Sequence, residues 1–569
     1  MQAGKMFDLE QKNGISCHGK SSGPGVYCIL CGAMWCSLAI IGILEVLLCL
    51  TPPISRDALI HHLAIPKLWI RHGGFYETPW NVFSYFPMNI DLLYLVPLLF
   101  GNDRLPAFIH LLFGWATGIL VYQYLKEQEG RLWGLLGLLV FVSTPVVIRL
   151  SVTAYVDLGM TFFTTASVLV YLRWRDGRYA DGKWFLLSAL FMGLAAGSKY
   201  NALISWVFLT VAVCYLYAKD TGTQMQAIRW GLLFSAIALA VVSPWFVKNL
   251  ILKGNPIYPL MDNLFSWIHV GRETPSYLAA GGAASGGYSV FGTRAILYGE
   301  ELWQILLLPF RIFFEGRDHS PQHFDGILNP LVVFAIPFAF AGSRKGHRLF
   351  FLLFIGFVFF VAAFTADMRI RYILPILPFL TILAVTGIRN ITEWLASRGQ
   401  VALKGVGRSV FLAVAVLLAA NLYYLANQFV TIRPLPYLLG AESRDEFLSR
   451  QVGSYPAVAY INRTLPDDAV VYLLFLGGRG YYLERDYLYH VSLENHMVKA
   501  MVRSSTDIPS LTRFLRSLGS THLLIRDEML QRTLEDNFPP ETVLDFLEKL
   551  AHCLIKVYES DGHSVYRIA

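Results

Sequence analysis

The sequence predicts a polytopic α-helical membrane protein with about eleven transmembrane helices and a soluble α/β domain at the C-terminus. Three observations support this fold class. Only 15% of the 569 residues are charged, whereas an average soluble domain has about 25%. Apolar residues recur in blocks of about 18–25, the length of helix that crosses about 30 Å of hydrocarbon. From about Thr431 onward the composition becomes that of an ordinary soluble protein.

The low charge also excludes several classes of protein. With 55% hydrophobic residues, the chain is neither a single soluble enzyme nor a disordered or fibrous protein. Its net charge of +7 is spread over many loops and forms no basic stripe, so no nucleic-acid partner is expected. Cys28 and Cys31 have the spacing of metal ligands, but they lie in the first apolar span, where free cysteine is an ordinary buried residue. We therefore predict no metal site there.

The first span follows a polar tail, residues 1–25, and continues to about Leu50. It is longer than a signal-peptide core and is not followed by a small-residue cleavage pattern, so it is interpreted as a retained helix. The apolar stretch Ile90–Phe100 is short and contains Pro97, so it could cross the membrane or lie in the interface. If it is interfacial, the remaining spans lie near residues 104–124, 132–149, 157–173, 184–197, 201–218, 229–250, 326–342, 349–366, 371–388 and 409–428.

Positive charge decides between these two topologies. With an interfacial Ile90–Phe100, every short loop rich in Lys and Arg falls on one side, which the positive-inside rule identifies as cytoplasmic. We therefore expect a protein of the cell inner (plasma) membrane, with a cytoplasmic tail at 1–25 and a transmembrane domain at 26–430. Long loops at 51–103 and 251–325 and the α/β domain at 431–569 would be periplasmic or extracellular.

Turn and periodicity signals define the α/β domain in outline. Residues 469–477, 481–490 and 521–527 are predicted to be strands, and 554–568 a hairpin around the turn pair Asp561–Gly562. Amphipathic helices are predicted at 511–519 and 541–553. About 140 residues are enough for a small independent domain.

Unusual polar residues gather at the predicted external face. Asp57 follows the first span, and a helix there would place His61 on the same face and His62 on the neighbouring one. The others stand at span ends: Asp157, Lys199, Arg369, Arg371 and Tyr372. Carboxylates can act as general bases, and clustered Arg and Lys suit a phosphate or pyrophosphate. Taken singly, each cation could instead be a snorkelling anchor and Asp157 a helix N-cap.

These residues resemble those of the GT-C glycosyltransferases that use polyprenyl-phosphate-linked sugars. The resemblance is strongest to bacterial relatives of the protein O-mannosyltransferases and to the aminoarabinose transferases that modify lipid A. It is carried by Asp57 in RDALIHHLAIPK, Asp157, Lys199 in GSKYN, the GNPIYP segment at Gly254–Pro259 and RYILPILPFL at Arg371–Leu380. The resemblance extends over nearly the whole chain.

The resemblance implies transfer of a sugar from a polyprenyl-phosphate donor to a lipid, glycan or protein acceptor on the external face, with inversion. Asp57 would be the general base and Asp157 would orient the acceptor or sugar. The implied substrate-binding residues are His61, His62, Lys199, Tyr258, Arg369, Arg371 and Tyr372, with Arg311 as a further phosphate candidate. No cofactor is required, although a divalent metal on His61 or His62 stays an open alternative. The aminoarabinose enzymes have Glu directly after the first Asp, whereas this chain has Ala58, so the identity of the sugar is not carried over.

Other classes of function stay open at this point. A membrane transporter or lipid flippase would also have many spans, but transporters often have internal repeats and midplane sites. This sequence has no convincing repeat, and its polar candidates lie at one face. A polymer ligase, or a non-catalytic scaffold of the same fold, is the third alternative.

Overall fold

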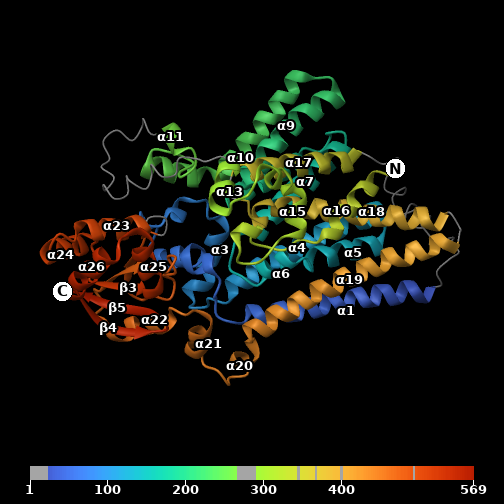
Figure 1. The fold of residues 1–569 in the computed structure, drawn as a ribbon. Helices are drawn as coiled ribbons and strands as arrows, with labels where there is room; N and C mark the ends of the chain where they lie inside the picture. Colours follow the sequence, from blue (N-terminus) through green and yellow to red (C-terminus); the bar gives the residue numbers. More distant parts are fainter. Residues whose placement is uncertain (1–23, 266–289, 342–345, 366–367, 398–400, 491–493) are drawn as a thin grey trace.

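The computed structural model describes residues 24–265, 290–341, 346–365, 368–397, 401–490 and 494–569. The predicted tail at 1–25 lies outside these residues except for its last two, and part of the loop predicted at 251–325 also lies outside them. The helices form an elongated bundle, and a small sheet domain with its own helices packs at one end of that bundle (Figure 1).

The bundle contains long helices joined by short helical turns. The helices up to residue 265 are α1 (Pro24–Cys49), α2 (Ala64–Arg71), α3 (Asn89–Leu99), α4 (Leu105–Glu129), α5 (Arg131–Val142), α6 (Pro145–Ser151), α7 (Asp157–Asp176), α8 (Gly182–Ala196), α9 (Ala202–Thr221), α10 (Gln224–Lys253) and α11 (Asp262–Phe265). Those after residue 290 are α13 (Val290–Tyr298), α14 (Leu302–Leu306), α15 (Leu308–Phe314), α16 (Pro330–Ala335), α17 (Gly346–Thr365), α18 (Leu377–Ser397) and α19 (Val401–Ile432). A π-helical turn, η1, spans Ala58–His62, and 3₁₀ turns span Val82–Tyr85, Pro321–His323, Ile336–Phe340 and Ile370–Ile376, the last labelled η7.

The chain is a multi-pass membrane protein, although the predicted number of spans is not confirmed. Seven helices of the described residues are long and apolar enough to cross a membrane, or eight if α5 and α6, which meet at 66°, count as one span. The expected spans at 157–173, 184–197 and 326–342 are not among them. In the structure α8 has only 15 residues, and the third segment is divided between α16 and a 3₁₀ turn. The short apolar stretch at 90–100 forms α3, an 11-residue helix.

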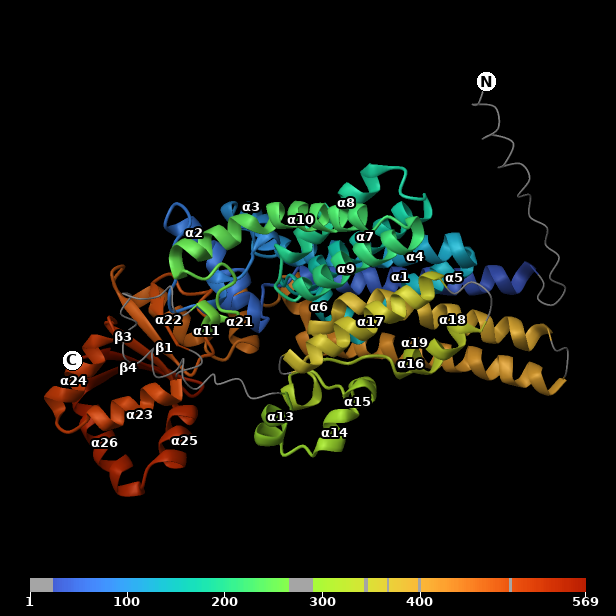
Figure 2. The ribbon, with the colours of Figure 1, turned by 90° about the horizontal axis from the view of Figure 1, so that it is seen from above.

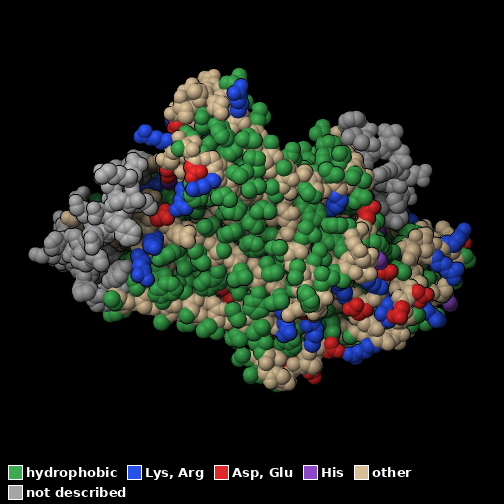
Figure 3. All heavy atoms as spheres, turned by 180° about the vertical axis from the view of Figure 1, so that it is seen from behind, with side chains coloured by type: hydrophobic (Ala, Val, Ile, Leu, Met, Phe, Trp, Pro, Cys, Tyr) green, Lys and Arg blue, Asp and Glu red, His purple; other side chains and the backbone are tan. Residues whose placement is uncertain are grey.

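Helix α18 lies at the centre of the bundle, and α1 and α19 lie at its surface. Of the apolar window that includes α18, 89% is buried, against 17% for the windows in α1 and α19. Large hydrophobic side chains such as Ile43, Leu232 and Phe360 are exposed, and hydrophobic side chains cover a broad central band of one face (Figure 3). Such a surface matches lipid hydrocarbon and would be unusual in water.

The break between α5 and α6 shapes the end of the bundle that faces the sheet domain. Pro145 ends one helix and begins the next, because its fixed φ suits a first helical turn while its ring cannot continue a preceding helix. After the break α6 carries Arg149, and the turn after α6 leads to Asp157 at the start of α7. The same end of the bundle therefore receives polar side chains from several connections.

The C-terminal domain is a five-stranded mixed sheet with helices. Its strands are β1 (Val470–Leu474), β2 (Asp486–Leu488), β3 (His522–Arg526), β4 (Leu554–Ser560) and β5 (His563–Ile568), in the order β2-β1-β3-β5-β4. Strand β1 pairs in parallel with β2 and β3, whereas β5 pairs antiparallel with β3 and β4. The hairpin turn lies at Asp561–Gly562, as predicted, and both residues have positive φ. The helices are α20 (Pro434–Leu438), α21 (Arg444–Gln451), α22 (Tyr455–Thr464), α23 (Glu494–Ser504), α24 (Ile508–Ser517), α25 (Asp527–Asn537) and α26 (Pro540–Cys553).

The two faces of this sheet have different partners. Helices α23 to α26 cover one face and form a core with residues such as Leu523 and Ile525 (Figure 2). The other face packs against α22 and against the loop after α1, because Ile60 and Leu68 belong to the same hydrophobic cluster as Leu473. The first long loop is thus held between the membrane helices and the sheet domain.

Candidate active site

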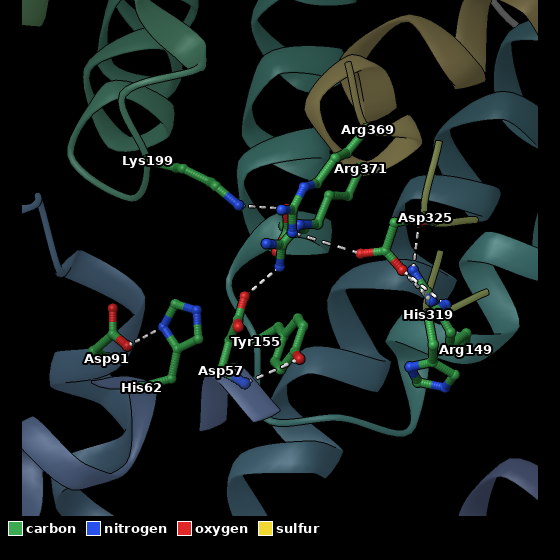
Figure 4. A network of polar contacts seen from close by, with 11 residues as sticks. Asp57, His62, Asp91, Arg149, Tyr155, Lys199, His319, Asp325, Arg369 and Arg371 are labelled. Carbon is green, nitrogen blue, oxygen red and sulfur yellow. Dashed lines mark hydrogen bonds and ion pairs between the residues drawn. The ribbon is translucent and has the colours of Figure 1, made fainter. Parts of the chain in front are cut away.

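Four connections meet at the end of the bundle beside the sheet domain. They are the loop after α1, the turn between α6 and α7, the turn between α8 and α9, and η7. Asp57, Lys199 and Arg371 point toward one another there (Figure 4). The chain thus brings together side chains that are up to 314 residues apart in sequence.

Asp57 is held at the start of η1. Its backbone N–H donates to the hydroxyl of Tyr155 at 3.1 Å, and its carboxylate forms an ion pair with Arg371. The two side chains are 17% and 12% exposed, so the pair is shielded but reachable from solvent. Burial by itself would raise the pKa of Asp57, but the Arg371 guanidinium holds that pKa well below its usual range. Asp57 is therefore ionised at neutral pH, the state that a general base needs.

A second ion pair lies beside the first. The Nζ of Lys199 donates to Oδ1 of Asp157 at 2.6 Å, and the Asp157 side chain is fully buried. The ring of Tyr372 lies 5.8 Å from the Lys199 ammonium and 5.6 Å from the Arg371 guanidinium. Two carboxylates and two cations thus form two neighbouring ion pairs, and the ring of Tyr372 lies beside both cations.

Arg369 lies next to this group and links it to a second network. Its Nη1 is 3.8 Å from Asp325, and Asp325 also accepts a hydrogen bond from Arg149 at 2.9 Å (Figure 4). Arg149 makes a further ion pair with Asp318 at 3.1 Å. The predicted phosphate-binding set of Lys199, Arg369 and Arg371 is therefore brought together at one place.

The two histidines are buried near Asp57. His62 Nδ1 lies 2.7 Å from a carboxylate oxygen of Asp91, and the His61 ring stacks on Phe83 with a centroid distance of 4.4 Å. Burial lowers the pKa of His61 well below its usual value and that of His62 to about 3, so both imidazoles are neutral at pH 7. His62 has a hydrogen-bond partner in Asp91, whereas Nδ1 of His61 is buried with no hydrogen-bond partner among the described residues. Contact of either imidazole with substrate stays a prediction.

The other predicted contacts lie further out. The carbonyl of Tyr258 accepts a hydrogen bond of 3.1 Å from Tyr200, the residue after Lys199, and the Tyr258 ring packs against Tyr85. Arg311 instead pairs with Glu300 at 3.0 Å, in a network that also holds Arg294. No group of three or more His, Cys, Asp or Glu side chains that could hold a metal occurs in the described part of the chain.

Three residues at or next to the site do not follow from the sequence reasoning. Tyr155 binds the backbone of Asp57, and it stands only two residues before Asp157. Asp91 is a carboxylate inside an apolar stretch, a signal that could have marked it. Asp325 pairs with Arg149 and Arg369, and nothing in its local sequence distinguishes it.

Comparison with known proteins identifies the fold that carries this site. Residues 87–247 match the family model of dolichyl-phosphate-mannose-protein mannosyltransferase. The crystal structure of apo ArnT from Cupriavidus metallidurans aligns at a TM-score of 0.54 and 16% identity, covering 94% of this chain and 97% of that one. ArnT from the same organism bound to undecaprenyl phosphate aligns at 0.55 and 16%, covering 94% and 98%.

The chain has the GT-C glycosyltransferase fold. An oligosaccharyltransferase from Archaeoglobus fulgidus, tethered with an acceptor peptide, also aligns at a TM-score of 0.50 and 12% identity, covering 94% of this chain and 74% of that one. No curated protein matches the chain by sequence. In this GT-C chain the paired carboxylates and cations stand where the membrane helices meet the sheet domain.

Proposed function

We propose that this protein is an integral-membrane glycosyltransferase that moves a sugar from a polyprenyl-phosphate donor to a lipid, glycan or protein acceptor. The observation that carries the proposal is the pair of ion pairs, Asp57 with Arg371 and Asp157 with Lys199, at one end of the bundle. The GT-C fold and the structure of ArnT with undecaprenyl phosphate support a lipid-linked phosphate donor.

The donor phosphate has a natural place between the two cations. Arg371 offers a planar guanidinium and Lys199 a compact ammonium, the two groups that proteins use most for phosphate. Each is already paired with a carboxylate, so an arriving phosphate competes with Asp57 and Asp157. When Arg371 turns to the phosphate, Asp57 loses the charge that holds down its pKa and becomes a stronger base.

The reaction itself is then a displacement at the anomeric carbon. The acceptor oxygen forms a bond to that carbon while the bond from the carbon to the phosphate oxygen breaks, and its electron pair stays on the lipid phosphate. The acceptor proton passes to Asp57. Arg371 and Lys199 stabilise the charge that develops on the leaving phosphate, which in such reactions is a large source of rate enhancement. Attack opposite the leaving group inverts the configuration.

We also propose that the site faces the outside of the inner (plasma) membrane. The short basic loops fall on the opposite side in the topology with an interfacial α3, and the sheet domain at 431–569 then lies outside with the site. Reporter fusions at residue 180 and at the C-terminus test this topology. Cytoplasmic activity of the C-terminal fusion would contradict it.

The decisive experiment on the reaction uses the purified full-length protein with radiolabelled polyprenyl-phosphate sugars. Asp57→Asn should lower transfer by a factor of about 10²–10⁴, the usual contribution of a positioned general base. Asp220→Asn is the matched control, because Asp220 also pairs with an arginine, Arg175, but lies at the end of α9 away from Asp57. Loss of sugar transfer in Asp57→Asn only is the expected result. An Asp57→Asn variant as active as wild type would overturn the assignment.

A further inference from the structure

A loop of the sheet domain reaches the candidate active site. Residues 475–485 connect β1 to β2 and lie against the segment that follows α1. The backbone N–H of Tyr481 donates to the carbonyl of Leu59 at 3.1 Å, and the Tyr482 hydroxyl donates to the carbonyl of Pro53 at 2.7 Å. These two bonds bracket Asp57 in sequence, so the tip of the loop is fixed beside the proposed base.

Two glycines set the path of this loop. Gly478 has φ +74°, and a Cβ there would lie 2.6 Å from the ring of Tyr489. A Cβ on Gly480 would lie 2.2 Å from the ring of Tyr487. The backbone therefore passes directly over two rings, and only glycine fits on either side of Arg479. The side chain of Arg479 stands between two residues that have none.

Arg479 is one of three arginines that gather here. The side chains of Arg56 and Arg479 are exposed. Partial desolvation and the charges of Arg56 and Arg526 lower the pKa of Arg479, and Asp57 is also within its electrostatic reach. The Arg56 guanidinium lies 3.6 Å from where a Cβ of Gly477 would be. Among the described residues, Arg56 and Arg479 make no ion pair, whereas Arg526 pairs with Glu528 at 2.9 Å.

Besides Asp57, which pairs with Arg371, the acid Glu494 faces this group. Glu494 begins α23 and accepts a hydrogen bond of 2.8 Å from the backbone N–H of Phe475. Burial raises the pKa of Glu494 to about 7, although Arg56 opposes the rise. At neutral pH this carboxyl is therefore only partly charged, and it leaves most of the positive charge uncompensated.

Arg479 and Arg526 lie at the carboxyl ends of parallel strands, where open α/β sheets commonly bind ligands. Arg479 follows β1 and Arg526 ends β3, its parallel neighbour. The chain passes from β1 to β2 on one side and later to β3 on the other, so the strand order reverses at β1. Ligands of open α/β sheets bind outside the carboxyl ends of the strands at such a reversal.

From these observations we propose that Arg56 and Arg479 form an anion site that holds a phosphate or carboxylate group of the acceptor. The proposal rests on the transferase function proposed above and adds the chemical class of its acceptor. Like charges held together without a paired carboxylate repel one another, and an anionic group relieves that repulsion. Because Arg56 precedes Asp57, an anion bound there brings a neighbouring acceptor hydroxyl to the base. The donor phosphate is expected at a different place, on Arg371 and Lys199.

The test is a binding measurement that needs no turnover. The purified full-length protein is first saturated with undecaprenyl phosphate, which occupies the donor site, and is then titrated with glucose 1-phosphate or with methyl glucoside. Glucose 1-phosphate should bind, and methyl glucoside should not. Arg56→Ala and Arg479→Gln should each weaken the binding of glucose 1-phosphate about tenfold or more, because each removes a hydrogen bond to a charged group. Arg513→Ala, an exposed arginine on α24, should leave it unchanged.

Several results would overturn the proposal. They are the absence of glucose 1-phosphate binding once undecaprenyl phosphate is bound, equal binding of methyl glucoside, and unchanged binding in both variants. If Arg479→Gln lowers the melting temperature of the protein, Arg56→Ala decides, since Arg56 lies outside the sheet domain. The proposed transferase activity is tested separately by Asp57→Asn, so failure of either proposal is recognised without the other.

Discussion

Arg371→Gln is the substitution that tests the reasoning most directly. Arg371 is the partner of Asp57 and, in the proposed reaction, a ligand of the donor phosphate. The variant keeps the size of the side chain and a hydrogen-bond donor but removes the charge. Two consequences are expected, one for the protonation of Asp57 and one for donor binding.

The first consequence concerns pH. Without the guanidinium, burial dominates and the pKa of Asp57 rises. The acid limb of the pH–rate profile should therefore move to higher pH. Because the pKa of Asp57 is lowered in the folded protein, the ion pair contributes stability above the ordinary Asp value of about 3.9. That contribution is lost as the pH falls through the folded pKa, and in Arg371→Gln it is lost at neutral pH as well.

The size of both effects follows from the geometry. Removing one partner of a buried pair costs about 3–5 kcal/mol, and the partial exposure of Asp57 and Arg371 places this pair at the lower end. A hydrogen bond to a charged group contributes about 1.5–3 kcal/mol, or about 10- to 100-fold in affinity. Since the donor must first displace Asp57 from Arg371, we expect the lower figure, a rise of about tenfold in the Kd for undecaprenyl phosphate.

The assay combines a thermal melt with a titration of undecaprenyl phosphate followed by tryptophan fluorescence. Arg389→Gln is the matched control, because Arg389 also pairs with acids, Glu129 and Glu393, and lies in α18, the helix that follows η7, away from the site. It should lose stability but keep the affinity for undecaprenyl phosphate. If Arg371→Gln binds undecaprenyl phosphate as tightly as wild type, Arg371 is not a ligand of the donor phosphate. If the acid limb of its pH–rate profile also stays in place, Arg371 does not lower the pKa of Asp57.

Three further outcomes are expected. Lys199→Met leaves the buried carboxylate of Asp157 unpaired and should lower stability by about 3–5 kcal/mol, whereas the double variant with Asp157→Asn should recover most of it in a thermal melt. Gly478→Ala and Gly562→Ala both place alanine at positive φ, but only the Cβ at position 478 meets a ring, that of Tyr489. Gly478→Ala should therefore destabilise the protein by about 1–3 kcal/mol more than Gly562→Ala. Equal melting temperatures of the two variants would contradict the close packing at Gly478. Glu494 should ionise as the pH rises through about 7. Binding of a sulfate ester, whose own charge is constant, to the Arg56–Arg479 site should therefore weaken severalfold over that range in the wild type. In Glu494→Gln the affinity for the sulfate ester should not change with pH.

The sequence predicts the class of the fold and the place of the site because both depend on local patterns. Blocks of apolar residues indicate a membrane bundle, and the polar residues at span ends, Asp57, Asp157, Lys199 and Arg371, are the ones that the structure brings together. The turn pair Asp561–Gly562 marks its hairpin because positive φ is strongly selective for residue type.

What the sequence does not predict depends on contacts between distant segments. Hydropathy does not show where a helix ends or breaks: α8 has only 15 residues, and the segment expected at 326–342 is divided between α16 and a 3₁₀ turn. The predicted count of eleven spans is therefore not confirmed. Asp325 and Arg479 come to the site through loops far from it in the chain. Nothing in the local sequence of Asp325 distinguishes it, and the glycines beside Arg479 indicate a turn but not where that turn lies.

The arrangement of charges suggests why the base and the donor site share a residue. A carboxylate that was always free to accept a proton could also activate water, and the donor would then be hydrolysed without transfer of the sugar to the acceptor. In this protein the charge that holds down the pKa of Asp57 belongs to Arg371. In the proposed mechanism the same charge attracts the donor phosphate. By this proposed mechanism, Asp57 therefore becomes a strong base only when the leaving group is in place. The anion site at Arg56 and Arg479 would then select the hydroxyl that receives the sugar, so that donor and acceptor are recognised by separate cations on either side of one carboxylate.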